Sequence, residues 1–556
     1  MSAAPSARAR PALCAIALLA LIPLAVPATR ERAAHAPPAA VSTAGENIYR
    51  FGRLLNGTPL RGERAGGAPV EGQDAACVNC HRRSGLGASE GRGFIPPITG
   101  RFLFHQQSGD REDRDLPYVE GARPYRAPYT EETLARAIRD GISVDGKPFS
   151  VLMPRFAMDD ASMAALIAYL RQLTTITVPG VSETVLQFAT IITPDADPVK
   201  RDAMLAVIRD YFAEKNANAR TVSPRLYSYR KQMFMVTRRW ELHVWELKGP
   251  ADSWEAQLRQ RLAAEPVFAV ISGIGGHNWA PVHHFCETAQ LPCLFPNVEL
   301  PVVAESDFHS LYFSRGVLLE ADLIAHQLQG SAAQPAVHRV VQVYRVGDVG
   351  VAAAGRLAAK MRAQGIAVVN RTVSGAAGGK ELAAAVREVR PDDGLVLWLR
   401  PKDLAAPGAM PARVAGIWIS GLMGGLENAP LPADWHKAAR LAYPFDLPDK
   451  RRVRVDYPLG WFRIRNVPVT DVQVQADTYL ACGLLSETLN HMVDTFVRDY
   501  LVERLEAMLE HRVITGYYPR LTLAPGQRFA SKGGYVVRFA DDSGTRIVPD
   551  SEWIVP

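Results

Sequence analysis

The spacing of apolar and polar residues divides the chain into two parts with different predicted elements. Up to about residue 175, short helical stretches alternate with loops rich in Gly and Pro, and residues 57–75 and 84–129 have no sustained period. A loop as long as the second one normally counts against a compact domain. It becomes acceptable where a large apolar cofactor, rather than secondary structure, organises the core.

The second part is predicted as strands that alternate with helices. The expected strands are 185–193, 240–247, 267–272, 293–295 and 311–313, followed by 339–344, 367–372 and 394–399. This alternation is typical of parallel sheets covered by helices on both faces, and two such runs predict two α/β lobes. One long amphipathic helix at about 474–510 and a β-rich tail complete the chain.

These changes of pattern define the expected domains, because a chain of 556 residues is too long for one compact core. In order, we expect a signal peptide at 1–28, a disordered leader at 29–43, an all-α domain at 44–175, a linker at 176–183 and a two-lobed α/β domain at 184–556. The leader is predicted from its composition, which is rich in Ala and Pro.

The first residues have the layout of a secretory signal. Arg8 and Arg10 precede an apolar run at 12–26, and small residues around Ala28 suit cleavage. A retained membrane anchor is the alternative interpretation. The run is short for a bilayer span and contains Pro23, which favours cleavage. We therefore expect the mature protein in the periplasm.

The most specific chemical signal is a CxxCH motif at 77–81. Thiols at this spacing can form thioethers with the two vinyl groups of one haem, and the adjacent imidazole is then placed as an axial iron ligand. A structural zinc site would need a second CxxC or HxxxH pair nearby, and a thioredoxin-like pair would follow a strand of a βαβ unit. The motif therefore predicts one covalent haem c on Cys77 and Cys80, with His81 bound to the iron.

A sixth iron ligand is expected later in the same domain. Met153 precedes Pro154, which holds the residue before it extended, and a predicted helix at 159–173 follows. A thioether ligand favours ferrous iron and raises the reduction potential, as electron carriers require. Met158 and Met163 are alternatives, but Met163 has a helix-core position and Met158 is less well placed. With both axial positions filled, we expect electron transfer at the haem and no enzyme chemistry.

These segments resemble the class I cytochrome c family over residues 44–175. The similar segments, in the family's order, are the helix at 45–51, the CxxCH motif, Pro-Pro-Ile-Thr-Gly at 96–100, the helix at 130–141 and Met-Pro-Arg-Phe at 153–156. The resemblance implies one low-spin haem with His81 and Met153 as axial ligands. It also implies a backbone carbonyl near Pro96 or Pro97 that accepts a proton from the other His81 nitrogen. The loop at 84–129 departs from the family and would cover one haem edge.

The α/β part resembles type 1 periplasmic solute-binding proteins, the class used for branched-chain amino acids. The likeness rests on residues 267–276, 291–296 and 312–316. It implies a ligand between the lobes, at the carboxyl ends of the strands. The candidate ligand residues are Gly276, His277, Asn278 and Asn297 in the first lobe and Tyr344 in the second. Backbone amides after Gly276 could bind a carboxylate, with a tight turn or a helix cap as the alternative interpretation.

The remaining cysteines belong to the second part. Cys286 and Cys293 flank a predicted helix-to-strand turn, and in an exported protein they form either a disulfide or two small buried thiols. Cys482 lies in an apolar helical stretch, where a packed core position is expected.

Charge and motif content argue against two function classes, nucleic-acid binding and catalysis. Apolar residues make up 48% of the chain and charged residues 22%, as in ordinary soluble proteins. The net charge of +6 is spread thinly, so we expect no nucleic-acid partner. The chain contains no Ser-His-Asp, HExxH or P-loop pattern, so no catalytic site is evident.

Together these patterns predict a periplasmic mono-haem electron carrier fused to a solute-binding or partner-docking module. Its redox partner would be a periplasmic dehydrogenase or oxidase, and its solute would be an amino-acid-like molecule or a small carboxylate. Two alternatives stay open. The protein could be a solute receptor whose cytochrome reports redox state, or a cytochrome subunit of a dehydrogenase complex.

Overall fold

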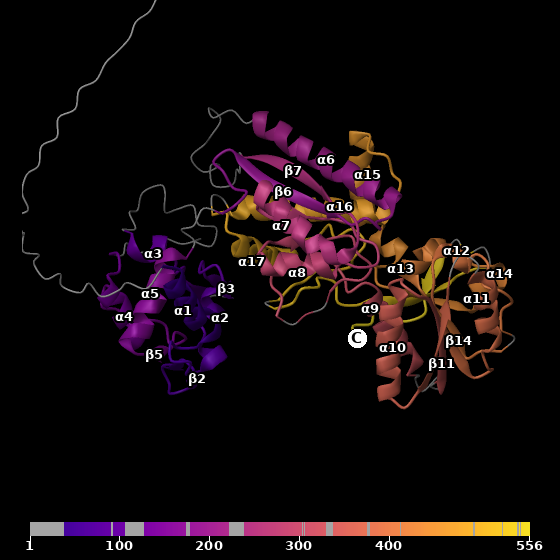
Figure 1. Cartoon of the computed structure of the whole chain (residues 1–556), viewed down its shortest axis with the longest axis horizontal. Helices are drawn as coiled ribbons and strands as arrows, with labels where there is room; N and C mark the ends of the chain where they lie inside the picture. The colour runs from indigo at the N-terminus through magenta and orange to yellow at the C-terminus, as the bar shows by residue number, and fades with distance from the viewer. Residues whose placement is uncertain are drawn as a thin grey trace, which may run out of the picture.

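The structure is a computed structural model of the chain. It describes residues 38–90, 93–105, 127–173, 178–221, 238–302, 304, 306–329, 337–374, 378–411, 413–492, 495–524, 526–541, 544 and 546–556. Figure 1 shows a small helical body, a central α/β lobe and a second α/β lobe. The predicted fold class is therefore confirmed: a small all-α domain is followed by a two-lobed α/β domain.

The small body is a group of helices around one core. Its helices are α1 (Pro38–Phe51), α2 (Val78–His81), α3 (Gly100–Phe104), α4 (Glu131–Asp140) and α5 (Asp160–Gln172). Side-chain caps define where the two later helices begin. The Thr133 amide donates to Thr130 Oγ1 at 3.2 Å, and the Ser162 amide donates to Asp159 Oδ1 at 2.8 Å.

The segments without a period contain short antiparallel strands. These are β1 (Arg61–Glu63), β2 (Pro69–Glu71) and β5 (Arg155–Ala157) in one sheet, and β3 (Ala88–Glu90) with β4 (Gly93–Ile95) in another. Strands of three residues are too short to produce a recognisable alternation in sequence. Part of the predicted loop at 84–129 is thus structured, and its residues 106–126 lie outside the described part.

The first helix begins earlier than expected. α1 starts at Pro38, inside the segment 29–43 that we predicted to be a disordered leader. Proline suits the first turn of a helix, and the two alanines after it are strong helix formers. The prediction is therefore wrong for residues 38–43. The predicted signal peptide lies outside the described residues.

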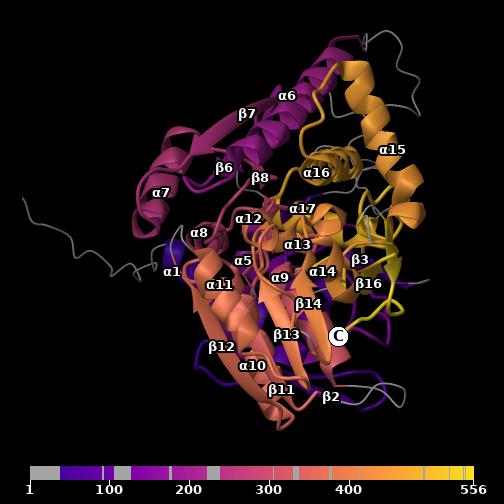
Figure 2. The same ribbon diagram turned by 90° about the vertical axis from the view of Figure 1, so that its right-hand side faces the viewer.

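The first α/β lobe contains a parallel sheet. Its strand order is β10-β9-β8-β6-β7, with β6 (Val185–Ile192), β7 (Arg239–Glu246), β8 (Ala269–Ile271), β9 (Cys293–Leu294) and β10 (Ser310–Leu311). Its helices include α6 (Pro198–Thr221), α7 (Trp254–Ala264) and α8 (Ala280–Thr288). Figure 2 shows this lobe above the second one.

The second lobe contains a mixed sheet of order β12-β11-β13-β14-β15-β16-β17. The strands are β11 (Arg339–Arg345), β12 (Ala367–Val373), β13 (Asp393–Trp398), β14 (Gly416–Ser420), β15 (Ala439–Tyr443), β16 (Tyr535–Phe539) and β17 (Ile547–Pro549). The first five are parallel; the sequence predicted β11, β12 and β13 but missed β14 and β15. The tail adds β16 and β17 in antiparallel orientation. The chain end therefore completes the sheet of a lobe that begins about 200 residues earlier.

Helices cover both faces of this sheet. They are α9 (Val317–Leu328), α10 (Gly350–Ala363), α11 (Gly378–Arg387), α12 (Pro401–Leu404), α13 (Gly421–Gly424) and α14 (Ala433–Ala438). Alternate strand residues enter two separate cores, with Val340 on the side of α9 and α10 and Val341 on the side of α11. Figure 1 shows the sheet edge-on between these helices.

The predicted long helix at 474–510 is wrong. The structure has α16 (Val472–Met492) and then a separate α17 (Arg498–Leu509), after α15 (Pro448–Arg465). A turn follows the end of α16, where the Thr495 amide donates to the Met492 carbonyl at 2.9 Å. Cys482 is fully buried in α16, as expected for a core residue.

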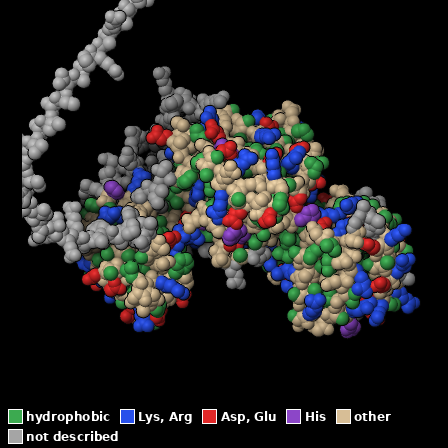
Figure 3. Space-filling model, in the orientation of Figure 1, with side chains coloured by type: hydrophobic (Ala, Val, Ile, Leu, Met, Phe, Trp, Pro, Cys, Tyr) green, Lys and Arg blue, Asp and Glu red, His purple; other side chains and the backbone are tan. Residues whose placement is uncertain are grey.

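No helix among the described residues is long and apolar enough to span a bilayer. On the viewed face of the two lobes, acidic and basic side chains are interspersed (Figure 3).

Candidate functional site

The CxxCH segment forms one short helical turn. α2 ends at His81, whose amide donates to the Cys77 carbonyl at 2.9 Å. Neither Cys77 nor Cys80 forms a disulfide, and Cys80 is exposed. Because residues three and four apart on a helix are neighbours, this turn presents two thiols and one imidazole side by side.

The imidazole of His81 is buried and oriented. Its Nδ1 lies 2.9 Å from the Pro96 carbonyl oxygen, the kind of contact that the family resemblance implied. This bond leaves Nε2 for a metal. Burial lowers the pKa of His81 to about 4, although the Pro96 carbonyl opposes the change. The imidazole is therefore neutral near pH 7, which is the form that binds iron.

The three candidate methionines differ in their surroundings. Met163 is buried inside α5, in the helix-core position that the sequence predicted. Met153 and Met158 are partly buried against the same core. The Met153 amide donates to the Ser150 carbonyl at 3.0 Å, so this residue lies on a turn just before β5. Met153 stays the predicted sixth ligand.

The residues present fit a haem c group. They supply two thiols outside any disulfide on one turn, a neutral imidazole with one engaged nitrogen, and a thioether on a turn that packs against the same core. Thr99 adds a buried hydroxyl that makes no hydrogen bond within the described part of the chain. A buried polar atom of this kind is available to a polar group of a bound cofactor.

Comparison with known families agrees with this geometry. Residues 72–174 match the family model described as Cytochrome c. They form a cytochrome c domain. The CxxCH turn and Met153 both lie inside the matched region, and a cytochrome c domain implies that haem c is bound. No curated protein sequence matches the chain.

Solved structures resemble the rest of the chain. A substrate-binding periplasmic protein from Ralstonia solanacearum is 13% identical with a TM-score of 0.50, and the match covers 66% of this chain and all of that one. A branched-chain amino acid transporter protein from Thermus thermophilus with bound valine is 12% identical with a TM-score of 0.48, covering 68% of this chain and 98% of that one. The first likeness confirms the predicted periplasmic-binding-protein fold, and at this identity it shows the fold alone.

The strand ends of the first lobe carry most of the predicted ligand residues. The amides of Gly276 and His277, which we expected to bind a solute carboxylate, instead donate to the carboxylate of Asp195 at 3.3 and 2.7 Å. A Cβ atom at Gly276 would lie 2.5 Å from Asp195 Cγ, so only glycine allows this approach. Burial opposes ionisation, yet bonds from Thr193 and His277 hold the pKa of Asp195 below its ordinary value.

The other predicted ligand residues also have partners. Asn278 Oδ1 accepts from the Ala280 amide at 3.0 Å, and Asn297 Nδ2 donates to Ser272 Oγ at 2.9 Å. Tyr344 packs against the core on the α9 and α10 side of the second lobe. The structure also joins Asn297 to the loop that carries Gly276 and His277, because the Gly275 amide donates to the Asn297 carbonyl at 3.4 Å.

Charged residues at the strand ends connect the two lobes instead. Arg400, which follows β13, donates to both Asp348 oxygens at 2.9 and 2.7 Å, and its Nη1 lies 2.7 Å from Glu299 of the first lobe. Lys200 approaches the same glutamate at 3.4 Å, and His277 Nε2 lies 3.8 Å from Asp348. Sequence reasoning selected His277 but missed the others: Lys200, Glu299, Asp348 and Arg400. The available signal was that each one follows a predicted strand, where ligands of parallel sheets bind.

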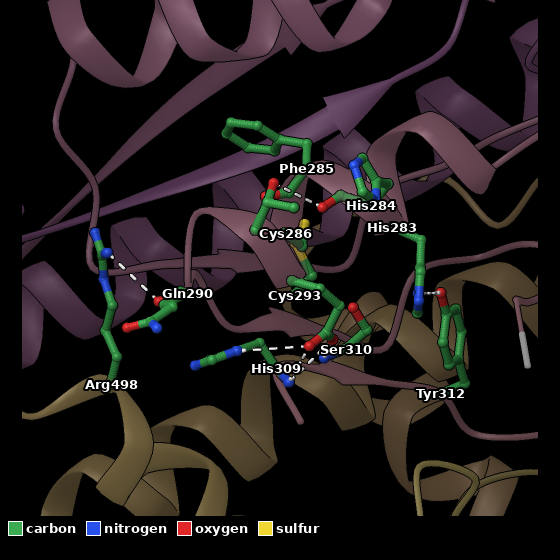
Figure 4. Close-up of a disulfide and its surroundings, with 12 residues drawn as sticks. His283, His284, Phe285, Cys286, Gln290, Cys293, His309, Ser310, Tyr312 and Arg498 are labelled. Carbon is green, nitrogen blue, oxygen red and sulfur yellow. Dashed lines mark hydrogen bonds and ion pairs between the residues drawn. A yellow bond between two sulfur atoms is a disulfide. The ribbon is translucent and has the colours of Figure 1, made fainter. Parts of the chain in front are cut away.

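A disulfide joins two core residues of the first lobe. Cys286 of α8 is bonded to Cys293 of β9, so of the two interpretations left open the structure has the disulfide. Beside it, Glu287 accepts from the amides of Phe308 and Ser310 at 2.9 and 2.7 Å. Figure 4 shows the disulfide between Cys286 and Cys293, with His309 and Ser310 of the neighbouring segment close to it.

Three side chains near the disulfide are spaced as metal ligands could be: His283, Glu287 and Asp307. Each of them already has a strong partner. His283 lies 2.7 Å from Asp307 and 2.8 Å from the Tyr312 hydroxyl, while Glu287 binds backbone amides. These contacts account for the cluster without a metal.

Proposed function

We propose that this protein is a mono-haem c-type electron carrier of the periplasm and not an enzyme. Its α/β domain would serve as a docking module for a redox partner, such as a dehydrogenase or an oxidase. The observation that carries the proposal is the α2 turn, which presents the thiols of Cys77 and Cys80 beside the buried imidazole of His81. One CxxCH motif in the chain corresponds to one haem.

Each residue of this turn has a separate role. Cys77 and Cys80 would hold the cofactor covalently, and His81 Nε2 would bind the iron while the Pro96 carbonyl fixes the ring orientation. Met153 would supply the second protein ligand of the iron. The bound haem supplies the one-electron chemistry. Burial of His81 excludes water from the proximal side, which suits reversible electron transfer.

A receptor for an amino-acid-like solute or a small carboxylate is the second candidate, on the basis of the fold. The Thermus thermophilus neighbour was solved with bound valine. In this chain, however, the amides that would bind a solute carboxylate already donate to the Asp195 side chain. We therefore favour partner docking over solute binding for the α/β domain.

Haem content and ligation test the proposal. In the full chain produced with a haem-maturation system, we expect one haem per protein by pyridine haemochrome and a matching increase in mass. We also expect a low-spin spectrum. Cys77→Ser together with Cys80→Ser should abolish covalent attachment, whereas Cys482→Ser should keep it. A high-spin oxidised spectrum with an exchangeable ligand, or chains without covalent haem, would contradict the proposal.

A further inference from the structure

The segment that follows His81 is held by the α/β domain. Ser84 is buried, and both of its polar groups donate to Glu503 of α17: the amide to Oε1 at 3.0 Å and Oγ to Oε2 at 2.6 Å. Ser84 Oγ also accepts from the Leu86 amide at 3.2 Å. Glu503 is only 4% exposed. One carboxyl group therefore organises the turn just after the iron-binding histidine, where α17 faces the small domain (Figure 1).

Opposite charges surround this contact. Arg82 lies 2.5 Å from Glu506, and Arg50 and Arg83 each lie 3.5 Å from Asp499. Arg82 and Arg83 belong to the cytochrome c domain, Arg50 belongs to α1, and the carboxylates belong to α17. Because these side chains are largely shielded from water, their interactions are stronger than those of exposed ion pairs.

α17 is itself fixed to the first lobe. Arg498 donates to the carbonyl oxygens of Val267 and Phe268, next to β8, at 2.6 and 3.2 Å. Asp499 lies 3.0 Å from His309 Nε2. A helix held in this way is a rigid support, so Glu503 can define where the haem-attachment segment sits.

We propose that Glu503 is a positioning residue of the α/β domain that acts through Ser84 on the haem-attachment segment and adjusts the reduction potential of the haem. This inference rests on the proposed function, because it requires haem on Cys77, Cys80 and His81. It gives the fused domain a role in electron transfer that needs neither a solute nor an outside partner.

Two physical effects support this role. Ser84 lies three residues beyond His81, so a shift of its hydrogen bonds changes the path of the chain that carries the imidazole. The second effect is electrostatic. A carboxylate in a buried interface stabilises the more positive, ferric state of a nearby haem, and protonation removes this stabilisation.

The charge of Glu503 changes within the neutral pH range. Burial raises the pKa of Glu503 to about 7, against the hydrogen bonds from Ser84 and the charge of Arg82. The other ionisable groups that face it or its partners are Tyr49, Arg50, Arg83, Asp499 and Glu506. Reduction should therefore become easier as the pH falls through about 7.

Redox titration of the haem-loaded full chain tests the inference, with Glu503→Gln measured below and above the pKa of about 7. We expect the wild-type potential to fall as the pH rises. In Glu503→Gln, the potential above pH 7 should be higher than in the wild type, and its dependence on pH should be much weaker. A role limited to folding would lower stability without removing the pH dependence.

Two further variants complete the test. Glu510→Gln, at an exposed position just after α17, should leave both the potential and its pH dependence unchanged. Ser84→Ala removes a hydrogen bond that favours the ionised form of Glu503, so it should move the pH transition of the potential upward. If Glu503→Gln does not fold, the measurement on Ser84→Ala tests the inference in its place. Wild-type pH dependence in both Glu503→Gln and Ser84→Ala would overturn the inference. A wild type without covalent haem would instead overturn the proposed function.

Discussion

At the residue scale, the environment of each sulfur atom determines what it can do. Cys77 and Cys80 lie on a short turn and form no disulfide, whereas Cys286 and Cys293 are joined by one within the core of the first lobe. Cys482 is enclosed by apolar side chains, and burial raises its thiol pKa well above the ordinary value. Of the described cysteines outside a disulfide, Cys77 and Cys80 are the ones that are not fully buried. Burial raises the pKa of the Cys77 thiol to about 12, so access to a cofactor, rather than a lowered pKa, distinguishes this pair.

The axial thioether gives a prediction at this scale. The substitution Met153→Leu removes the sulfur but keeps the apolar volume of the side chain. We therefore expect a high-spin ferric spectrum and a lower reduction potential of the haem. The control Met158→Leu changes a neighbour that packs on the same core and should stay low-spin. Absorption spectra and redox titration of the two variants decide the assignment. The reverse pattern would identify Met158 as the ligand.

The disulfide gives a second prediction. Cys286 and Cys293 are separated by seven positions, and closing so short a loop stabilises a fold by about 2 to 3 kcal/mol. The double variant with Cys286→Ala and Cys293→Ala should therefore unfold at a lower denaturant concentration than the wild type. A reducing agent should destabilise the wild type but not the double variant. Equal sensitivity of both proteins to the reducing agent would show that this bond contributes nothing.

At the element scale, the strand ends of the two lobes are tied together by the chain's own side chains. The loop after β6 supplies Asp195 to the amides of the loop after β8, and Arg400 joins Asp348 to Glu299 across the lobes. Parallel strands place these loops at one edge of each sheet.

The substitution Asp195→Ala should remove the hydrogen-bond acceptor of the Gly276 and His277 amides. We expect faster hydrogen exchange at these two amides and a loss of about 1 kcal/mol of stability, since a partly exposed charged hydrogen-bond acceptor is removed. Asp202→Ala, an exposed position on α6, is the matched control and should change neither quantity. Unchanged exchange in Asp195→Ala would mean that the carboxylate does not hold this loop in solution.

At the scale of the whole molecule, buried carboxyl groups make stability depend on pH. Burial raises the pKa of Glu320 to about 8 and that of Asp477 to about 7, above the ordinary values of 4.5 and 3.8. A group whose pKa is raised in the folded state stabilises the fold below its unfolded pKa. This contribution is lost as the pH rises through the folded value. The denaturation midpoint should therefore fall between about pH 5 and 8.

The variant Glu320→Gln tests this dependence. A neutral amide cannot ionise, so the decline of stability with rising pH should be smaller than in the wild type. Asp499 has a pKa of about 2, since its bonds with His309 and arginines outweigh the effect of burial. Its contribution is present at neutral pH and is lost only in acid, so Asp499→Asn should leave the alkaline decline unchanged. Identical pH profiles for Glu320→Gln and the wild type would contradict the buried state of this carboxyl.

The sequence by itself determined the chemistry of the haem site and the class of the second domain. Cys77, Cys80 and His81 lie within one helical turn, so their spacing along the chain already places them side by side. Strand and helix periods likewise depend on neighbours in sequence, and they predicted the two parallel sheets. The single helix expected at 474–510 was wrong because a local turn interrupts an otherwise continuous apolar pattern.

Only the tertiary structure decided how distant residues pair. Ser84 and Glu503 are 419 positions apart, and Asp195 and His277 are 82 apart, so no local spacing could bring either pair together. Such contacts depend on how whole elements dock, and docking is determined by the summed burial of apolar faces rather than by the pair itself. For the same reason, the side chains that join the two lobes and support the haem segment became visible only in the folded chain.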